Sequence, residues 1–124
     1  MSESKLHFKA EVLHASKETS DKFYMIGAAD DKFDYKNYFI AQKSYKGVSN
    51  SEELEELYVE YSIDNGKHYN AQYNSCKKVT LSEKQMVLDL DDVTIEVDVA
   101  NTAISEKFAK YAKNIFGNML ESSL

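Results

Sequence analysis

The sequence contains no arginine, no tryptophan and no proline, and it has a single cysteine, Cys76. One cysteine cannot form a disulfide within the chain, and this usage is typical of the reducing cytoplasm. Arginine is the usual bidentate partner of phosphate and carboxylate ligands, so its absence argues against nucleotide chemistry. The same composition is also what an AT-rich genome would produce. The four glycines form no glycine-rich phosphate loop.

Long apolar segments are absent as well. No run approaches the roughly 18 residues that a membrane-spanning helix needs, and residues 1–5 lack the basic start and apolar stretch of a signal peptide. With 124 residues, 43% hydrophobic and 29% charged, the chain has the size and composition of one globular domain. We therefore expect a single domain, residues 1–124, in the cytoplasm and without a membrane partner.

The charge balance is acidic. Fifteen lysines against 21 Asp and Glu residues give a net charge of −6. Proteins that bind nucleic acid neutralise phosphates with basic side chains, so we expect no nucleic-acid partner. A basic protein would be attracted instead.

Metal-ligating and catalytic patterns are also missing. The residues that could bind zinc lack any pair of ligands at close spacing; they are His7, His14, His68 and Cys76. The acids at 30–34 and 89–92 lack the glycine and the distal glutamate of a calcium loop. Paired carboxylates of a glycosidase would call for aromatic sugar platforms, usually tryptophan. We expect no metal, no cofactor and no catalytic residues.

Apolar residues at every second position predict strands at 6–12, 57–63 and 93–99. Residues 23–29 and 37–45 are apolar enough to predict two further strands. Residues 79–81 and 86–90 predict a hairpin closed at 82–85, and Asp64-Asn65-Gly66 predicts a tight turn. Residues 68–75 are polar and aromatic, and we predict a loop there.

The period changes near the C-terminus, where apolar residues recur at three and four positions, which predicts one helix. They are Ile104, Phe108, Tyr111, Ala112, Ile115, Phe116, Met119 and Leu120. Asn101 or Thr102 could cap its start, and Gly117 could end it. The predicted fold is α+β: an antiparallel β-meander of about six or seven strands with the C-terminal helix packed on one face.

The acidic residues form three groups that could bind a basic partner. The first shares outward parity on the last two strands: Asp89, Asp91, Glu96 and Asp98. The second comprises Glu52, Glu53, Glu55, Glu56 and Glu60, and the third Asp30, Asp31 and Asp34. Like charges on neighbouring strands destabilise a fold, whereas charge complementary to a partner speeds association. A solvated surface would explain the same distribution.

The middle of the chain resembles the immunity protein 10 family of bacterial polymorphic-toxin systems. The most specific blocks are GAADDKFD at 27–34 and NYFIAQK at 37–43, and the similarity continues through YVEY at 58–61 and weakly at 77–81. It covers about residues 23–100. The family tends to have a glycine-rich stretch where HYNAQYN stands at 68–74. The resemblance implies an immunity protein that binds and neutralises a cognate secreted toxin without catalysis.

A toxin blocked by an acidic inhibitor would be basic, and a nuclease fits that description. The alternative is a small enzyme or ligand-binding domain with a pocket between sheet and helix, since tyrosine is favoured in pockets as well as at interfaces. The tyrosines that could line such a pocket are Tyr24, Tyr38, Tyr61 and Tyr111.

Overall fold

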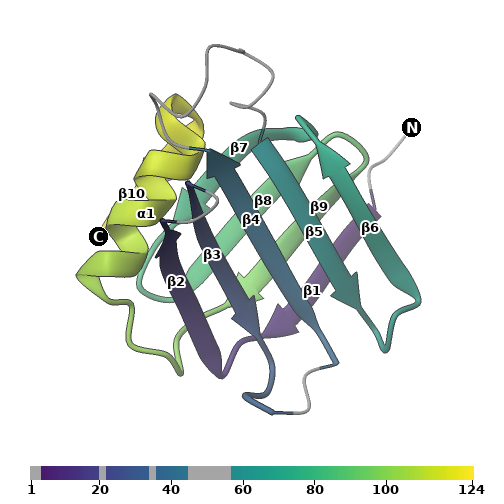
Figure 1. Cartoon of the computed structure of the whole chain (residues 1–124). Coiled ribbons are helices and arrows are strands. Elements are labelled where there is room, and N and C mark those ends of the chain that lie inside the picture. The colour runs from purple at the N-terminus through teal and green to yellow at the C-terminus, as the bar shows by residue number, and fades with distance from the viewer. Residues whose placement is uncertain (1–3, 20–21, 34–35, 45–56) are drawn as a thin grey trace.

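The computed structural model describes residues 4–19, 22–33, 36–44 and 57–124 (Figure 1). These residues form ten strands, one α-helix and a short 3-10 turn, η2. The strands are β1 (Ser4–Lys9), β2 (Val12–Glu18), β3 (Phe23–Ala29), β4 (Tyr38–Ser44), β5 (Leu57–Ile63), β6 (His68–Tyr73), β7 (Cys76–Leu81), β8 (Gln85–Leu90), β9 (Val93–Asp98) and β10 (Leu120–Ser122). The helix is α1 (Glu106–Phe116), and η2 covers Gly117–Met119.

The strands form two five-stranded sheets that lie one behind the other in Figure 1. The first sheet has the order β1-β9-β8-β7-β10, and the second has the order β2-β3-β4-β5-β6. The α+β class is confirmed, but the single meander of six or seven strands is wrong. Only the second sheet is a complete antiparallel meander. The first sheet contains two parallel pairs, β1 with β9 and β10 with β7.

The predicted strand at 6–12 is in fact divided between the two sheets. The backbone N–H of Ala10 donates to the carbonyl of Asp98 in the first sheet (2.8 Å), and the next N–H, of Glu11, donates to Ala29 in the second (2.9 Å). The Ala10 side chain is completely buried at this crossing. Apolar residues recur at every second position through the crossing, so the sequence pattern shows one strand where the structure has two. The buried side nevertheless changes there, because Val12 lies on the outer side of β2 and Leu13 packs against the core.

The core lies between the two sheets and against the helix. Each strand directs every second side chain inward, as the period of two requires. The first sheet contributes Phe8, Val79, Leu81, Met86, Leu88, Leu90, Val93, Ile95 and Val97. The second contributes Ile26, Ala28, Phe39, Ala41, Leu57, Val59, Tyr61 and Ile63. The side chains at the other positions of each strand form an outer face that does not contribute to this core.

The helix packs against β2 and β3 at one edge of the second sheet (Figure 1). Its predicted apolar stripe is buried at Phe108, Ile115 and Phe116, while Tyr111 is half-buried against Tyr24, with ring centroids 5.0 Å apart. No helix among the described residues has the length and hydropathy to cross a membrane.

The cap at Asn101 or Thr102 is wrong, because the helix begins later. The Ser105 side chain accepts a hydrogen bond from the backbone N–H of Phe108 (3.0 Å). Thr102 instead donates to the carbonyl of Val99 (2.7 Å) in the turn that follows β9. The helix ends at Gly117, as predicted, with a positive φ of 56°.

Residues 68–73 are not a loop but the edge strand β6, which pairs with β5. The turn before it is confirmed: Asp64, Asn65 and Gly66 all have positive φ. The alternation that marks a strand is present in β6, but its apolar side is directed outward, with Tyr69 and Tyr73 among the most exposed large side chains.

Removing the helix anchor should destabilise the fold. Phe108→Ala should lower the free energy of unfolding by about 3–5 kcal/mol, because the side chain is fully buried between helix and sheet. Lys110→Ala, on the exposed side of the same helix, should change it by less than about 0.5 kcal/mol. Denaturant titration of both variants measures this; equal losses would contradict the packing of the helix.

Candidate functional site

The outer face of the first sheet carries both signs of charge. Asp89, Glu96 and Asp98 lie on it, each at an outward position of β8 or β9. Lysines stand beside them: Lys5 Nζ lies 3.3 Å from Glu96 Oε2, and Lys78 is in register with Asp89. Lys9 is likewise in register with Asp98, and Lys78 Nζ pairs with Glu121 Oε2 at 3.1 Å. Of these predicted partner-binding residues, Glu96 is in an ion pair, and the other two lie in register with lysines on the neighbouring strands.

Asp91 does not join that group. It lies after the end of β8, where its backbone N–H donates to the carbonyl of Ser75 (2.7 Å). Its side chain is exposed in the turn between β8 and β9 rather than on the sheet. Of the four acids predicted to face outward from the last two strands, three lie on the sheet and Asp91 lies in a turn.

Asp30 organises the connection between β3 and β4. Its carboxylate accepts hydrogen bonds from the backbone N–H of Lys36 (2.8 Å) and from both the backbone and side-chain amides of Asn37 (3.1 and 2.8 Å). Burial raises the pKa of this carboxyl, but the hydrogen bonds outweigh burial and hold the pKa below its usual value. Asp31 accepts from the backbone N–H of Phe33 (2.8 Å).

The remaining predicted acids fall outside the residues that the structure describes. They are Asp34, Glu52, Glu53, Glu55 and Glu56.

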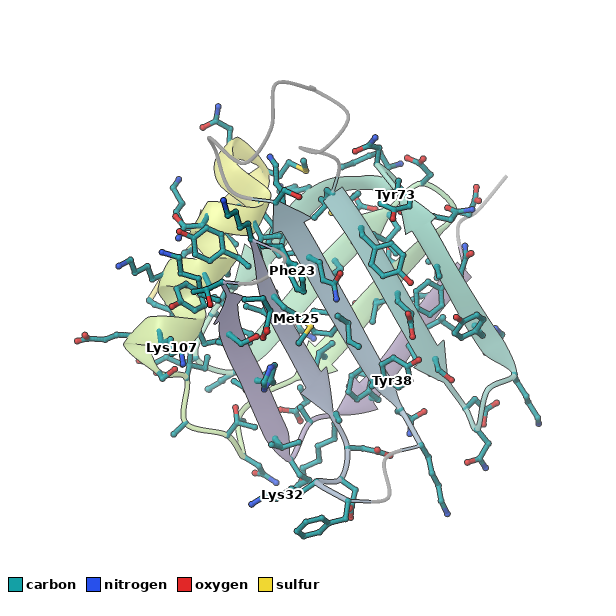
Figure 2. The ribbon with its side chains drawn as sticks, in the orientation of Figure 1. Phe23, Met25, Lys32, Tyr38, Tyr73 and Lys107 are labelled. Atoms are coloured by element: carbon teal, nitrogen blue, oxygen red, sulfur yellow. The ribbon has the colours of Figure 1, made fainter. Side chains whose placement is uncertain are left out.

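The outer face of the second sheet has a different composition, and we call it the aromatic face (Figure 2). Its side chains come from three cross-strand rows and a short fourth one. The rows are Val12, Ala29, Tyr38, Ser62 and Tyr69; His14, Gly27, Ile40, Glu60 and Ala71; Ser16, Met25, Gln42, Tyr58 and Tyr73; and Glu18, Phe23 and Ser44. In Figure 2 the labelled Phe23, Met25, Tyr38 and Tyr73 lie on the near side of this sheet, away from the first sheet.

Glu60 lies on β5 within the aromatic face, next to the edge strand β6. The Tyr38 hydroxyl donates to its Oε2 (2.5 Å), and the Tyr58 hydroxyl donates to its Oε1 (2.7 Å). The Tyr58 ring in turn packs on Tyr73 of β6, with centroids 5.2 Å apart. The hydrogen bond to Glu60, together with burial and the nearby negative charge, raises the pKa of Tyr58 to about 12. The phenol therefore stays protonated at neutral pH and keeps the carboxylate in place.

The aromatic face has carboxylates but no ammonium group of its own. None of its outward strand positions is a lysine, although the chain contains fifteen. The ion pairs found among the described residues do not include Glu60. The absence of neighbouring lysines distinguishes Glu60 from the acids of the first sheet, which have lysines on the adjacent strands.

A shallow apolar depression of about 170 Å³ lies over Gly27, which belongs to the same cross-strand row as Glu60. Its floor is at Gly27, and Val12, Met25, Tyr38 and Ile40 are among its lining residues. A Cβ at Gly27 would lie 2.9 Å from the carbonyl oxygen of Phe39, closer than packed atoms tolerate. The glycine therefore allows the close approach of β3 and β4 and leaves the depression open.

The four tyrosines proposed to line a pocket between sheet and helix do not meet. Tyr24 and Tyr111 pack on each other beside the helix, Tyr61 is buried between the sheets, and Tyr38 belongs to the aromatic face. Tyr38 instead donates a hydrogen bond to Glu60, a residue predicted for a different role, the binding of a basic partner.

The titratable candidates for chemistry are dispersed in the described part of the chain. No group of three or more His, Cys, Asp or Glu residues suited to a metal ion is found there. Cys76 is half-buried, and burial raises its pKa to about 11, so the thiol stays protonated and unreactive.

Met25, Ile40, Tyr69 and Tyr73 were not among the residues that the sequence patterns predicted for a functional surface. A signal was available in strands 23–29 and 37–45, which are apolar at consecutive positions rather than alternate ones. Such a strand has an apolar outer side as well as an apolar inner side.

The model of the family described as Immunity protein 10 matches residues 9–107 of the chain. The match begins at the end of β1 and extends through β9 to the start of the helix, so it includes all of the aromatic face. No curated protein and no solved structure matches the chain.

The Tyr58–Glu60 contact predicts an alkaline effect on stability. Because the folded pKa of Tyr58 lies above the value of about 10 for a free phenol, this contact contributes stability fully below pH 10. The contribution should be lost as pH rises through about 12. In Glu60→Gln, Tyr58 should ionise at lower pH. Phenolate absorbance of the wild type and Glu60→Gln, each compared with its Tyr58→Phe variant, measures the shift; identical titration curves would contradict it.

Proposed function

The chain belongs to the immunity protein 10 family, and on that basis we propose that it protects its host by binding and neutralising a cognate protein toxin. The observation that carries the proposal is the family match over residues 9–107, which spans both sheets. The toxin belongs to a bacterial polymorphic-toxin system, and the immunity protein acts on it in the cytoplasm.

Neutralisation proceeds by occlusion and requires no catalysis. The chain covers the toxin's active site or another essential surface, so its own task is tight and specific binding. A sheet face rich in aromatic side chains supports this task, because tyrosine and methionine are enriched at the centres of protein interfaces. Exposed apolar area of this kind is costly for a protein that has no partner.

The toxin is basic, and a nuclease is the class that fits best. A nuclease needs positive charge to hold its phosphate backbone. A chain with a net charge of −6 is drawn to such a surface over a distance comparable to the Debye length, about 8–10 Å at physiological salt.

The direct test is co-expression with the toxin domain encoded beside this gene. The chain should restore growth of cells that produce the toxin and should co-purify with it, whereas an unrelated immunity protein should do neither. The association rate should fall by about tenfold or more as salt increases, because screening removes the charge attraction. A chain that neither restores growth nor binds the toxin would disprove the proposal.

A further inference from the structure

Resting on that proposed function, we infer that the aromatic face is the surface that holds the toxin. Glu60, on β5, binds a lysine or arginine side chain that the toxin presents among apolar residues. The depression over Gly27 receives one of those apolar side chains.

The geometry of Glu60 suits a cation from outside the chain. A carboxylate has about four acceptor positions, and the Tyr38 and Tyr58 hydroxyls occupy one on each oxygen. The remaining positions are available to a further donor. Because the two phenols already hold the carboxylate, little side-chain entropy remains to be lost on binding. Ile40 and Ala71 flank Glu60 on the neighbouring strands, so a bound partner would exclude water from the ion pair.

The depression lies on the same cross-strand row as Glu60, two strands away. Neighbouring strands are about 4.8 Å apart, so an apolar side chain in the depression and a cation at Glu60 would be separated by roughly 10 Å. Tyr69 and Tyr73, which are 59% and 61% exposed, extend the surface on the far side of Glu60. The toxin segment that fits has an apolar side chain and a basic one at that spacing.

Charge distinguishes the toxin from a second copy of this chain. In a symmetric dimer the same face meets itself. Two copies of Glu60 would then approach each other, and no lysine on the outward strand positions of either copy could compensate them. Burying an uncompensated carboxylate is costly, so a basic partner is favoured over self-association.

Charge also distinguishes this face from the outer face of the first sheet. There Glu96 already has Lys5 at 3.3 Å, and Asp98 and Asp89 stand in register with Lys9 and Lys78. A toxin cation would have to compete with Lys5 for Glu96, whereas none of the ion pairs found among the described residues includes Glu60.

The test compares Glu60→Gln with Glu96→Gln in binding kinetics with the cognate toxin domain. Both changes remove one carboxylate from an outward position in a sheet, and glutamine keeps the shape of the side chain. Glu60→Gln should raise Kd at least about 30-fold, mainly through faster dissociation. Glu96→Gln should change Kd by less than about threefold, as expected for a partly exposed ion pair.

Two further variants guard against a folding artefact, and the melting temperature of each variant is measured alongside. Tyr73→Ala changes an exposed side chain of an edge strand and should raise Kd about tenfold. Ser62→Lys places a cation two residues from Glu60 on the same face and should weaken binding as strongly as Glu60→Gln. Both should remain folded.

If the wild-type chain binds the toxin tightly and Glu60→Gln, Tyr73→Ala and Ser62→Lys bind equally well, the aromatic face is not the interface, while the proposed function stands. If the wild type neither binds nor protects, the proposed function fails and this inference fails with it. Sedimentation of the free chain gives the third outcome: a dimer that Ser62→Lys dissociates without changing toxin affinity would assign the face to a second copy and overturn the inference.

Discussion

The alternation of side chains along each strand is the constraint on which the structure depends. Each strand can bury only one side against the opposite sheet, and the buried sets of both sheets, with the helix, make one continuous core. The outer faces are then free to differ. The first sheet has lysines and acids at its outer positions, whereas β3 and β4 have Met25, Gly27, Ala29 and Ile40 at theirs. The core therefore depends on the inner faces, and the composition of each outer face can vary independently of it.

Local patterns in the sequence were sufficient for most individual elements. Strands β3 and β5, the hairpin of β7 and β8, the turn at Asp64 to Gly66 and the apolar stripe of the helix all depend on residues close together in the chain. Topology depends on distant pairs, such as Ser4 beside Val93. The crossing between sheets at Ala10 lies inside an unbroken series of alternate apolar residues, and the change of buried side shows only in the consecutive apolar residues Val12 and Leu13. Strand β6 was missed because its alternating residues are tyrosine and alanine, a weaker apolar signal than the leucine, valine and isoleucine of β5.

In the candidate site, too, local patterns were predictable from the sequence, whereas contacts between distant residues were not. Parity alone placed Asp89, Glu96 and Asp98 on one outer face, but the lysines that balance them come from β1 and β7, and only the register brings them together. Glu60 resembled the other acids in the sequence. Of its two phenol donors, Tyr58 lies on the same strand, whereas Tyr38 is 22 positions away in the sequence and reaches Glu60 only because β4 pairs with β5. The absence of lysine on this face likewise follows from the register of the five strands. The number of acids in a sequence segment therefore does not give the net charge of the surface on which those acids lie.

A crystal structure of the chain bound to its cognate toxin domain tests the central claim most directly. The account predicts that the toxin covers β3 to β6, with the nitrogen of a lysine or arginine within hydrogen-bonding distance of the Glu60 carboxylate and an apolar side chain over Gly27. A toxin bound to the outer face of β1, β9, β8 and β7, with the aromatic face open to solvent, would contradict it.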